Sequence, residues 1–292
     1  MAAPALDRAP AAPRRRRPAR RLPAALLWGG AIIAAVVILI ALAPAIAPYP
    51  YDEMNILARL QPPSAAHWFG TDEFGRDVLS RVLIGGRLSL IMGFGATALC
   101  LALGVPLGLL AGYRRGRVDE AIMRVMDVIM SFPPILLGLL VLAVGTPSFW
   151  KAVLAVGLVY VPSMVRLTRS VTLNLVSEEF IVAAHARGEG AAYILFSEIL
   201  PNAWPPIAVE ASLKVTFAIL LGASLSFLGM GAQPPSSDWG LMISGARPLV
   251  NSAPWVALAP GLAMCLTVIG INLLGDGLRE ALDPRMVRAH RQ

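Results

Sequence analysis

Few side chains in this sequence are spaced for catalysis. The three histidines, His67, His185 and His290, are far apart, and none stands in a Ser/His/Asp or His/Glu set typical of an active site. No Gly-rich loop followed by Lys and Ser or Thr occurs, so the chain does not hydrolyse ATP in the P-loop manner. Cys100 and Cys265 lie in apolar stretches without metal-ligand spacing. We therefore predict that the chain is not an enzyme.

An acidic segment at residues 70–77 has the residue types of a cation site. Its Gly, Asp and Glu residues superficially resemble a calcium loop. The segment lacks the twelve-position alternation and the terminal bidentate Glu of such a loop. We therefore predict no metal here, and we expect Asp72 or Thr71 to cap a helix instead.

A second polar segment, residues 178–202, predicts a pair of short helices. Phe180–Ala184 and Tyr193–Phe196 have apolar residues at helical spacing, and Gly188 and Gly190 between them permit a sharp turn. Such a helix pair either fits a groove on another protein or lies on lipid headgroups. The spacing alone leaves both interpretations open.

Ionisable residues near the apolar segments are candidates for a transport site, because charges inside a membrane are costly. Glu120 and Arg124 are i, i+4 neighbours and Arg124 and Asp127 are i, i+3 neighbours, so we expect them to neutralise one another. Glu210 and Lys214 form a similar pair. The sequence contains no run of acids suited to a proton relay and no internal repeat, which disfavours a secondary carrier.

The composition indicates that membrane helices position these residues. The 292 residues are 57% hydrophobic and 15% charged, with a mean hydropathy of +0.67. A span requires about 20 apolar residues. Five uncharged runs reach this length, and Arg166 can extend a shorter sixth by snorkelling. We expect six spans at residues 26–47, 88–113, 128–150, 152–165, 215–237 and 249–275.

The first span resembles a secretory signal because a basic region precedes it and Ala45-Ile46-Ala47 imitates a cleavage site. Its uncharged run is longer than the apolar core of about 7–15 residues that a signal carries. We therefore interpret residues 26–47 as a membrane anchor.

The net charge of +7 sets the orientation of the chain and does not indicate nucleic-acid binding. Residues 1–25 hold seven arginines and one Asp, and therefore six of the seven net charges. Because cytoplasmic segments are enriched in Lys and Arg, this tail belongs inside, which puts seventeen Lys and Arg residues inside and six outside. We predict that both termini are cytoplasmic and that residues 1–25 form a disordered tail.

The rest of the chain divides accordingly. Residues 48–87 form an external strap, whose four prolines favour an extended course, with a short amphipathic helix around Val78–Leu83. Residues 88–278 form the membrane core, which includes the loop 178–202. Residues 279–292 form a cytoplasmic tail.

Ala183-Ala184, Gly188 and Leu200-Pro201 have the spacing of the Glu-Ala-Ala motif of binding-protein-dependent ABC importer permeases. Further short motifs make the chain resemble the second permease subunit of dipeptide and oligopeptide importers, in collinear order over about residues 25–288. These motifs are His67–Asp72, Gly75–Asp77, Ser80-Arg81, Ala111–Tyr113, Asp119, Met123-Arg124, Asp127, Phe132-Pro133, Leu225–Gly229, Pro234-Pro235, Asp238–Gly240, Pro254-Trp255, Asn272-Leu273, Gly275–Arg279 and Asp283–Arg285.

Three places depart from this pattern. Val182 replaces the Glu of the motif, Arg187 replaces a more usual Leu, and Ser197-Glu198 replaces an Arg-His pair. A missing Glu is common in this subgroup, so the resemblance still implies docking on an ATPase. The reversed charge at Glu198 suggests a compensating basic group on that ATPase.

The resemblance implies an all-α integral membrane protein with the type I ABC importer permease fold, in the inner membrane of a bacterium. Ala183, Ala184, Gly188, Leu200 and Pro201 would couple it to the ATPases. The implied partners are a second, similar permease subunit that completes a heterodimer, two cytoplasmic ATPases and an extracytoplasmic binding protein. ATP and Mg would be bound by the ATPases, so no cofactor is expected in this chain.

Topology places Asp72, Asp77 and Arg247 on the external side, where we expect them to contact the binding protein. The alternative is that they only form structural turns.

Import of peptides is the function that the resemblance favours. The same architecture carrying a nickel chelate, glutathione or another small solute stays open, because the subgroup shares these motifs. A self-sufficient secondary carrier and a membrane anchor or assembly factor are further alternatives.

Overall fold

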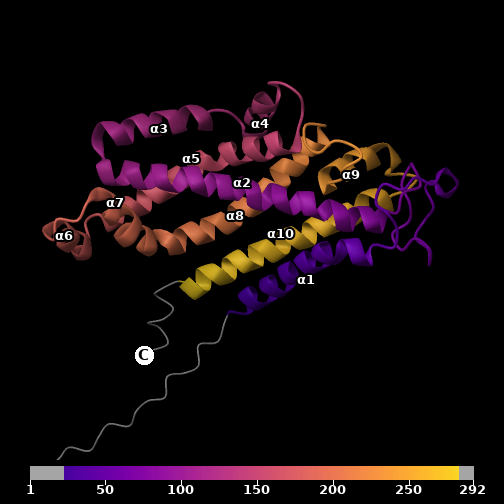
Figure 1. The fold of residues 1–292 in the computed structure, drawn as a ribbon, viewed down its shortest axis with the longest axis horizontal. Coiled ribbons are helices and arrows are strands. Elements are labelled where there is room, and N and C mark those ends of the chain that lie inside the picture. Colours follow the sequence, from indigo (N-terminus) through magenta and orange to yellow (C-terminus); the bar gives the residue numbers. More distant parts are fainter. Residues whose placement is uncertain (1–22, 283–292) are drawn as a thin grey trace, which may run out of the picture.

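The computed structural model describes residues 23–282, and within this range the chain forms helices joined by loops (Figure 1). Five helical segments are long and apolar enough to cross a membrane. They are α1 (Ala24–Ile46), α2 (Val78–Arg114), α5 (Phe149–Leu175), the segment Ala191–Phe227 that ends in α8 (Leu200–Phe227), and α10 (Trp255–Leu282). The predicted all-helical membrane fold is confirmed. Most of the basic tail and of the C-terminal tail lies outside the described residues.

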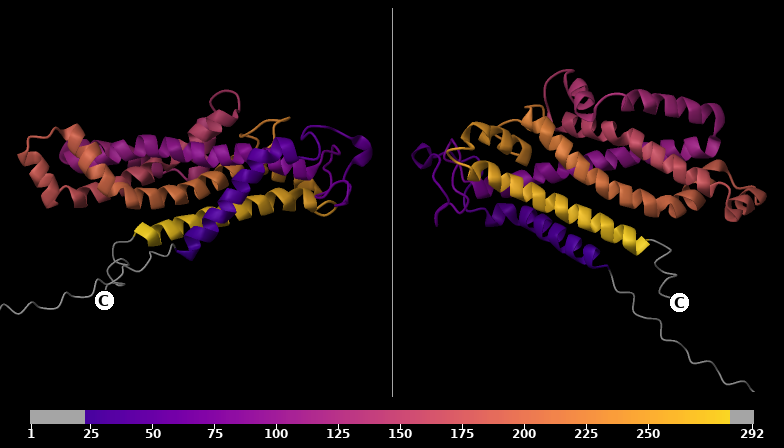
Figure 2. Two further views of the ribbon diagram at one scale, coloured as in Figure 1. Left: turned by 60° about the horizontal axis from the view of Figure 1, so that its bottom comes forward. Right: turned by 180° about the vertical axis from the view of Figure 1, so that it is seen from behind.

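The long helices run along one axis, so the molecule has two distinct ends (Figure 1). One end carries α6 (Glu179–Ala186), and we call it the α6 end. The other carries residues 47–77 with the 3-10 turn η1 (Ile56–Ala58), together with α9 (Trp239–Ala246) and η3 (Arg247–Leu249); we call it the strap end. From each direction in Figure 2, α1 lies against α10, on the side of the molecule away from α3 and α4.

Glycines allow α2 and α5 to pack closely. A Cβ at Gly104, Gly108 or Gly112 of α2 would collide with the α5 residues facing these positions, which are Met164, Thr168 and Thr172. Small residues at every fourth position let membrane helices approach closely, where van der Waals contact replaces the hydrophobic driving force. This contact forms the centre of the bundle, and α8 packs against both helices.

The third predicted span is broken. Instead of one helix over residues 128–150, the chain forms α3 (Gly116–Met130) and α4 (Pro134–Leu142), which are bent by 90°. Pro133 and Pro134 explain the break, since proline cannot continue the helix hydrogen bonds and restricts the residue before it. The total is therefore five spans, or six if this bent pair counts as one.

The fourth predicted span, residues 152–165, is too short, because α5 continues to Leu175. Arg166, which was expected to extend this span by snorkelling, and Arg169 are instead paired with acids of α3. Arg166 Nη2 lies 2.6 Å from Asp127 Oδ1, and Arg169 Nη2 lies 2.6 Å from Asp119 Oδ2. Asp127 therefore pairs across helices and not with Arg124, whereas Arg124 and Glu120 do form the expected pair, at 3.6 Å.

An arginine compensates for a proline in α1. Pro44 has no N–H, so it cannot bond to the carbonyl of Ile40 four residues earlier. Arg87 of α2 donates through Nε to that carbonyl at 3.3 Å, and through Nη2 to the carbonyl of Ala41 at 3.3 Å. The helix therefore continues through Pro44 with its free carbonyl satisfied.

The short helix predicted around Val78–Leu83 is not a helix of its own, since these residues form the first turns of α2. The strap before it is ordered by long-range contacts. Trp255 Nε1 donates to the carbonyl of Thr71 at 3.2 Å, and Tyr49 N donates to Ser80 Oγ at 3.3 Å. The strap is thus tied to the starts of both α2 and α10.

Candidate coupling surface and strap-end pocket

Helix α6 has one buried and one exposed face. Ile181 and Ala184 are fully buried and pack in an apolar cluster with residues of α2, α5 and α8. Val182, Ala183 and Ala186 are exposed. Of the two predicted coupling alanines, Ala184 therefore anchors the helix and Ala183 lies on its surface.

Gly188 ends α6 in a Schellman motif. Its N–H donates to the carbonyl of His185 at 2.9 Å, and the N–H of Glu189 donates to the carbonyl of Ala184 at 3.2 Å. Gly188 has a φ of +78°, which costs any other residue backbone strain, although nothing lies within 4 Å of a Cβ built there. The predicted turn at this glycine is therefore present, and it depends on backbone conformation and not on lack of space.

Two of the departures from the family pattern pair with each other. Arg187 Nη2 donates to Glu198 Oε1 at 3.1 Å, and Arg187 Nε lies 3.6 Å from Glu189 Oε1. The charge at Glu198 is therefore compensated within the chain. The inferred basic group on an ATPase is not needed to explain it.

The second predicted helix is more complex than the spacing suggested. After α7 (Ala191–Tyr193), residues Ile194–Ile199 form a π-helical turn, η2, before α8 begins at Leu200. Asn202 Nδ2 donates to the carbonyl of Glu198 at 2.7 Å across this junction. Leu200 is partly buried against the apolar cluster, whereas Pro201 is exposed in the first turn of α8. The helix runs through this junction from the π-helical turn, so Pro201, which has no N–H, leaves one helix bond unmade there.

The π-helical turn changes which apolar side chains are exposed. A π-helix has bonds at i, i+5, so it shifts the helical register by one residue. Ile194 and Ile199 are buried, whereas Tyr193 and Phe196 are about half exposed. Trp204 on the first turns of α8 is exposed to a similar degree. Sequence periodicity missed this exposed aromatic surface, because it assumed a regular helix.

At the strap end, Asp72 is the centre of a buried network. Its Oδ1 accepts the N–H groups of Phe74 and Arg76 at 2.9 and 3.0 Å, and its Oδ2 accepts Arg76 Nε at 2.7 Å. Arg81 Nε lies 3.5 Å from the same Oδ2. Asp72 is only 3% exposed, so it has little surface for an external partner.

Asp77, not Asp72 or Thr71, caps α2. Asp77 Oδ2 accepts the N–H and the hydroxyl of Ser80 at 2.8 Å each, which is the bonding of an N-cap residue. Its Oδ1 lies 2.9 Å from His67 Nδ1, and it is 2% exposed. The cap is therefore five residues further along the chain than Asp72, in the same loop. The burial of Asp72 and Asp77 favours the structural-turn alternative for both.

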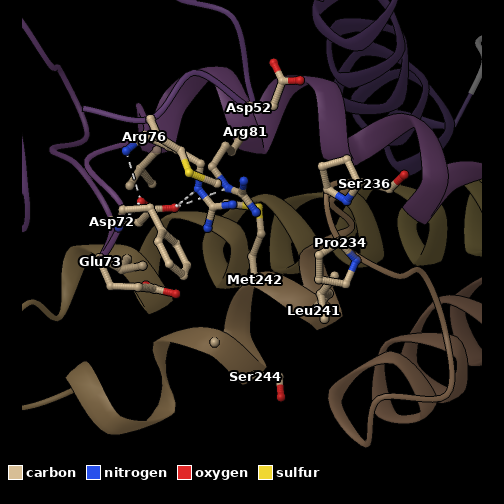
Figure 3. A pocket seen from close by; sticks show the side chains of 16 residues that line it. Asp52, Asp72, Glu73, Arg76, Arg81, Pro234, Ser236, Leu241, Met242 and Ser244 are labelled. Carbon is tan, nitrogen blue, oxygen red and sulfur yellow. Dashed lines mark hydrogen bonds and ion pairs between the residues drawn. The ribbon is translucent and has the colours of Figure 1, made fainter. Parts of the chain in front are cut away.

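The Asp72 network forms one wall of a pocket of about 520 Å³. Figure 3 shows Asp72, Arg76 and Arg81 converging on one side, with Pro234, Ser236 and Leu241 on the other. Arg247, the third predicted contact, is exposed at the start of η3. The structure thus brings Asp72 close to the α9 region and leaves Arg247 accessible on the outer surface.

Asp238 caps α9 near this pocket. Its Oδ1 accepts the N–H of Leu241 at 3.0 Å, and the residue is 4% exposed. Burial raises the pKa of Asp238, and the hydrogen bond from the Leu241 N–H offsets only part of that rise. Within residues 23–282, no group of three or more His, Cys, Asp or Glu side chains is arranged to hold a metal ion.

Comparisons with known proteins match most of the chain. Residues 104–288 match the binding-protein-dependent transport system inner membrane component family, and residues 23–63 match the N-terminal transmembrane domain of oligopeptide transport permease C. The first match contains α6, Gly188 and the beginning of α8.

Relatives with different named substrates are similar over nearly the whole length. The dipeptide transport system permease protein DppC of Alkalihalophilus pseudofirmus is 48% identical over 88% of this chain and 85% of its own. The glutathione transport system permease protein GsiD of Pectobacterium atrosepticum is 44% identical over 82% of this chain and 77% of its own. The oligopeptide transport system permease protein OppC of Bacillus subtilis is 38% identical over 88% of this chain and 85% of its own.

The fold is similar to that of a chain in an inward-facing structure of the MetNI methionine ABC transporter. The TM-score is 0.58 at 20% identity, over 72% of this chain and 96% of that chain. This likeness confirms the predicted fold.

Proposed function

Because this chain belongs to the binding-protein-dependent transport system inner membrane component family, we propose that it is a permease subunit of an ATP-driven importer of di- and oligopeptides. Membership makes it a multi-pass membrane component of a bacterial importer, without a catalytic domain. ATPase and binding-protein partners follow from the family. The relatives named for dipeptides and oligopeptides support peptides as the substrate class. The relative named for glutathione supports a narrower second candidate, import of glutathione.

The α6 end couples transport to the cytoplasmic ATPases in this proposal. The supporting observation is the division of α6 into a buried face at Ile181 and Ala184 and a small, exposed apolar face at Val182, Ala183 and Ala186. The buried face ties α6 to the bundle, so force applied to the exposed face is transmitted to α8. Gly188 fixes the end of α6, and Leu200 and Pro201 lie where the π-helical turn passes into α8.

The charge of this end favours docking on protein over the lipid alternative. Residues 178–202 contain four acids and one arginine. The cytoplasmic surface of a membrane is negative and attracts basic segments. An acidic helix pair is therefore poorly suited to lie on lipid headgroups, whereas its exposed alanines suit close packing in a protein groove.

A second, similar permease subunit would complete the translocation path in a heterodimer. Two ATPases would bind ATP and Mg; in this chain the sequence has no P-loop, and residues 23–282 contain no cluster of metal-binding side chains. The positive-inside count supports cytoplasmic termini, which puts the α6 end in the cytoplasm and the strap end outside. There Arg247 is the accessible candidate for binding-protein contact, while Asp72 and Asp77 would hold the strap in shape.

Exchange of Gly188 for valine tests the coupling role. Valine at a φ of +78° costs at least the roughly 1–2 kcal/mol of the left-handed conformation, so the Schellman motif should open and α6 should change direction. We expect Gly188→Val to spare membrane insertion and co-purification of the second permease, and to abolish ATP-driven peptide uptake in proteoliposomes containing the complete transporter.

Gly190 offers a matched control two residues away. It has a φ of −71° and, like Gly188, has nothing within 4 Å of a Cβ built there. Gly190→Val should therefore retain uptake. Normal uptake and substrate-stimulated ATPase activity in Gly188→Val would refute the coupling role. A protein that is active alone, without a second permease and ATPases, would refute the importer proposal itself.

A further inference from the structure

A charged pair lies at the midpoint of α8. Lys214 Nζ is 2.8 Å from Glu210 Oε1. Lys214 is about 20 Å from either end of α8, at 1.5 Å per residue. Charged groups at such a depth are costly, and those that persist mark pathways or pairs inside the bundle.

The two partners differ in how they are covered. The Lys214 side chain is 9% exposed, and its Nζ lies 5.4 Å from the ring centre of Tyr160 and 5.7 Å from that of Phe217. Tyr160 also donates its hydroxyl to the carbonyl of Phe217 at 3.2 Å, which ties α5 to α8 at this level. Glu210 is 26% exposed, so its carboxylate is more accessible than the ammonium group of Lys214. The Lys214–Glu210 pair is therefore a dipole whose negative end, the Glu210 carboxylate, is the more accessible one.

Glu210 belongs to an open stripe along α8. Pro206, Phe217 and Leu220 are exposed at helical spacing on either side of it, and Leu213 is partly exposed between them. A carboxylate on this stripe would be costly against lipid, so the stripe must face either a water-filled path or protein. The combination of an accessible carboxylate and an exposed aromatic ring selects a cation, because carboxylates form charge-assisted hydrogen bonds and ring faces attract positive charge.

We propose that Glu210, Tyr160 and Phe217 form a half-site in the translocation path that binds the α-ammonium group of a peptide. This inference rests on the proposed function for the identity of the ligand. Lys214 is a positioning residue: it offsets the charge of Glu210 within the membrane while the two rings shield its own charge from the path.

Cysteine labelling tests the site without depending on transport. Leu213→Cys, one turn from Glu210, is the reporter in a Cys265→Ala background, since Cys265 is exposed and Cys100 is buried. The complete transporter is treated with cationic and anionic methanethiosulfonate reagents. We expect the cationic reagent to react about five- to tenfold faster, which corresponds to a local potential of about 1 kT per unit charge for reagents of charge +1 and −1. Leu262→Cys on α10 is an exposed apolar control without a neighbouring carboxylate, and it should show no preference.

Two substitutions test whether Glu210 is the cause. Glu210→Gln should abolish the preference at residue 213. Because that change leaves Lys214 without its partner, the double variant Glu210→Gln/Lys214→Met removes both charges and should give the same loss. A preference that survives in both variants would overturn the proposal, as would a reporter that reacts with neither reagent because lipid or the partner subunit covers the stripe.

Peptide protection then identifies the ligand. A dipeptide with a free amino terminus should slow labelling of Leu213→Cys, and its N-acetylated form should not. Equal protection by both forms would overturn the ammonium site. Uptake by the wild-type transporter is measured in the same vesicles. Absence of dipeptide uptake would count against the proposed substrate, while the charge preference and its loss in Glu210→Gln would still test the half-site.

Discussion

The two ends of this molecule use charged side chains differently. At the strap end, Asp72 and Asp77 are buried and each accepts several bonds from its own segment or from α2. At the α6 end, Arg187 is half exposed and reaches Glu198 and Glu189 through single contacts. The strap end is therefore built as a fixed frame, whereas the α6 end is anchored mainly by the apolar cluster beneath it.

This difference fits the tasks that we propose for the two ends. A frame that closes the outside of a bundle has to keep its shape. Buried ion pairs with several hydrogen bonds give that rigidity, but their charges are then not accessible to a partner. A surface that docks on a moving ATPase has to leave side chains accessible. The exposed Val182, Ala183 and Phe196 meet that requirement, with Ile181 and Ala184 underneath to transmit motion.

Asp72→Ala should produce the largest loss of stability, because it leaves Arg76 and Arg81 buried without their common partner. We expect a loss of about 3–5 kcal/mol in unfolding free energy, measured by denaturant unfolding in detergent. Asp52→Ala, an exposed carboxylate of the same pocket, is the control and should change stability by no more than about 0.5 kcal/mol. Equal effects of the two substitutions would show that the strap end is not a rigid frame.

Asp238 gives an intermediate, pH-dependent effect at the same end. Burial raises the pKa of Asp238, so the folded state binds its proton more tightly than the unfolded state does. The stability that the protonated Asp238 carboxyl contributes is therefore fully present below the ordinary carboxyl pKa of about 4, and it is lost as the pH rises through the raised pKa.

Asp238→Asn keeps an acceptor for the Leu241 N–H and removes the buried charge. We expect the variant to gain stability relative to wild type at neutral pH, and this gain to shrink as the pH is lowered toward about 4. Asp238→Ala should instead lose about 1 kcal/mol with the helix cap. Thermal unfolding across this pH range checks both, and a pH-independent difference for Asp238→Asn would contradict the argument.

The smallest effect is expected at the α6 end. A double-mutant cycle on Arg187→Ala and Glu198→Ala should give a coupling energy of about 0.2–1 kcal/mol, since the pair is exposed. A coupling as large as the loss in Asp72→Ala would abolish the contrast between the two ends. A coupling of zero would mean that the apolar cluster alone holds α6.

The long helices were predictable from sequence because uncharged runs of sufficient length occur for most of them. The fourth span was predicted too short for a physical reason: Arg166 and Arg169 are neutralised by Asp127 and Asp119, far away in the sequence. The broken third span was also missed, although Pro133 and Pro134 were visible, because the apolar run continues across them.

At the candidate site, too, the sequence predicts some features and misses others. The turn at Gly188 was predictable, because local backbone chemistry determines it. The π-helical turn and the Arg187–Glu198 pair were not, since one requires a register shift and the other joins residues eleven positions apart. Asp72 and Asp77 are both aspartates of one loop, so residue type does not distinguish them. The structure shows that Asp77 is the helix cap.

In the proposed function, the exposed face of α6 docks on an ATPase. Ala183→Cys in a Cys265→Ala background measures this most directly, through its rate of reaction with a water-soluble thiol reagent. We expect rapid reaction in the purified permease pair and strong protection after the ATPases are added, while Asp52→Cys at the strap end reacts equally in both samples. An Ala183→Cys rate that is the same with and without bound ATPases would show that this face does not dock on them.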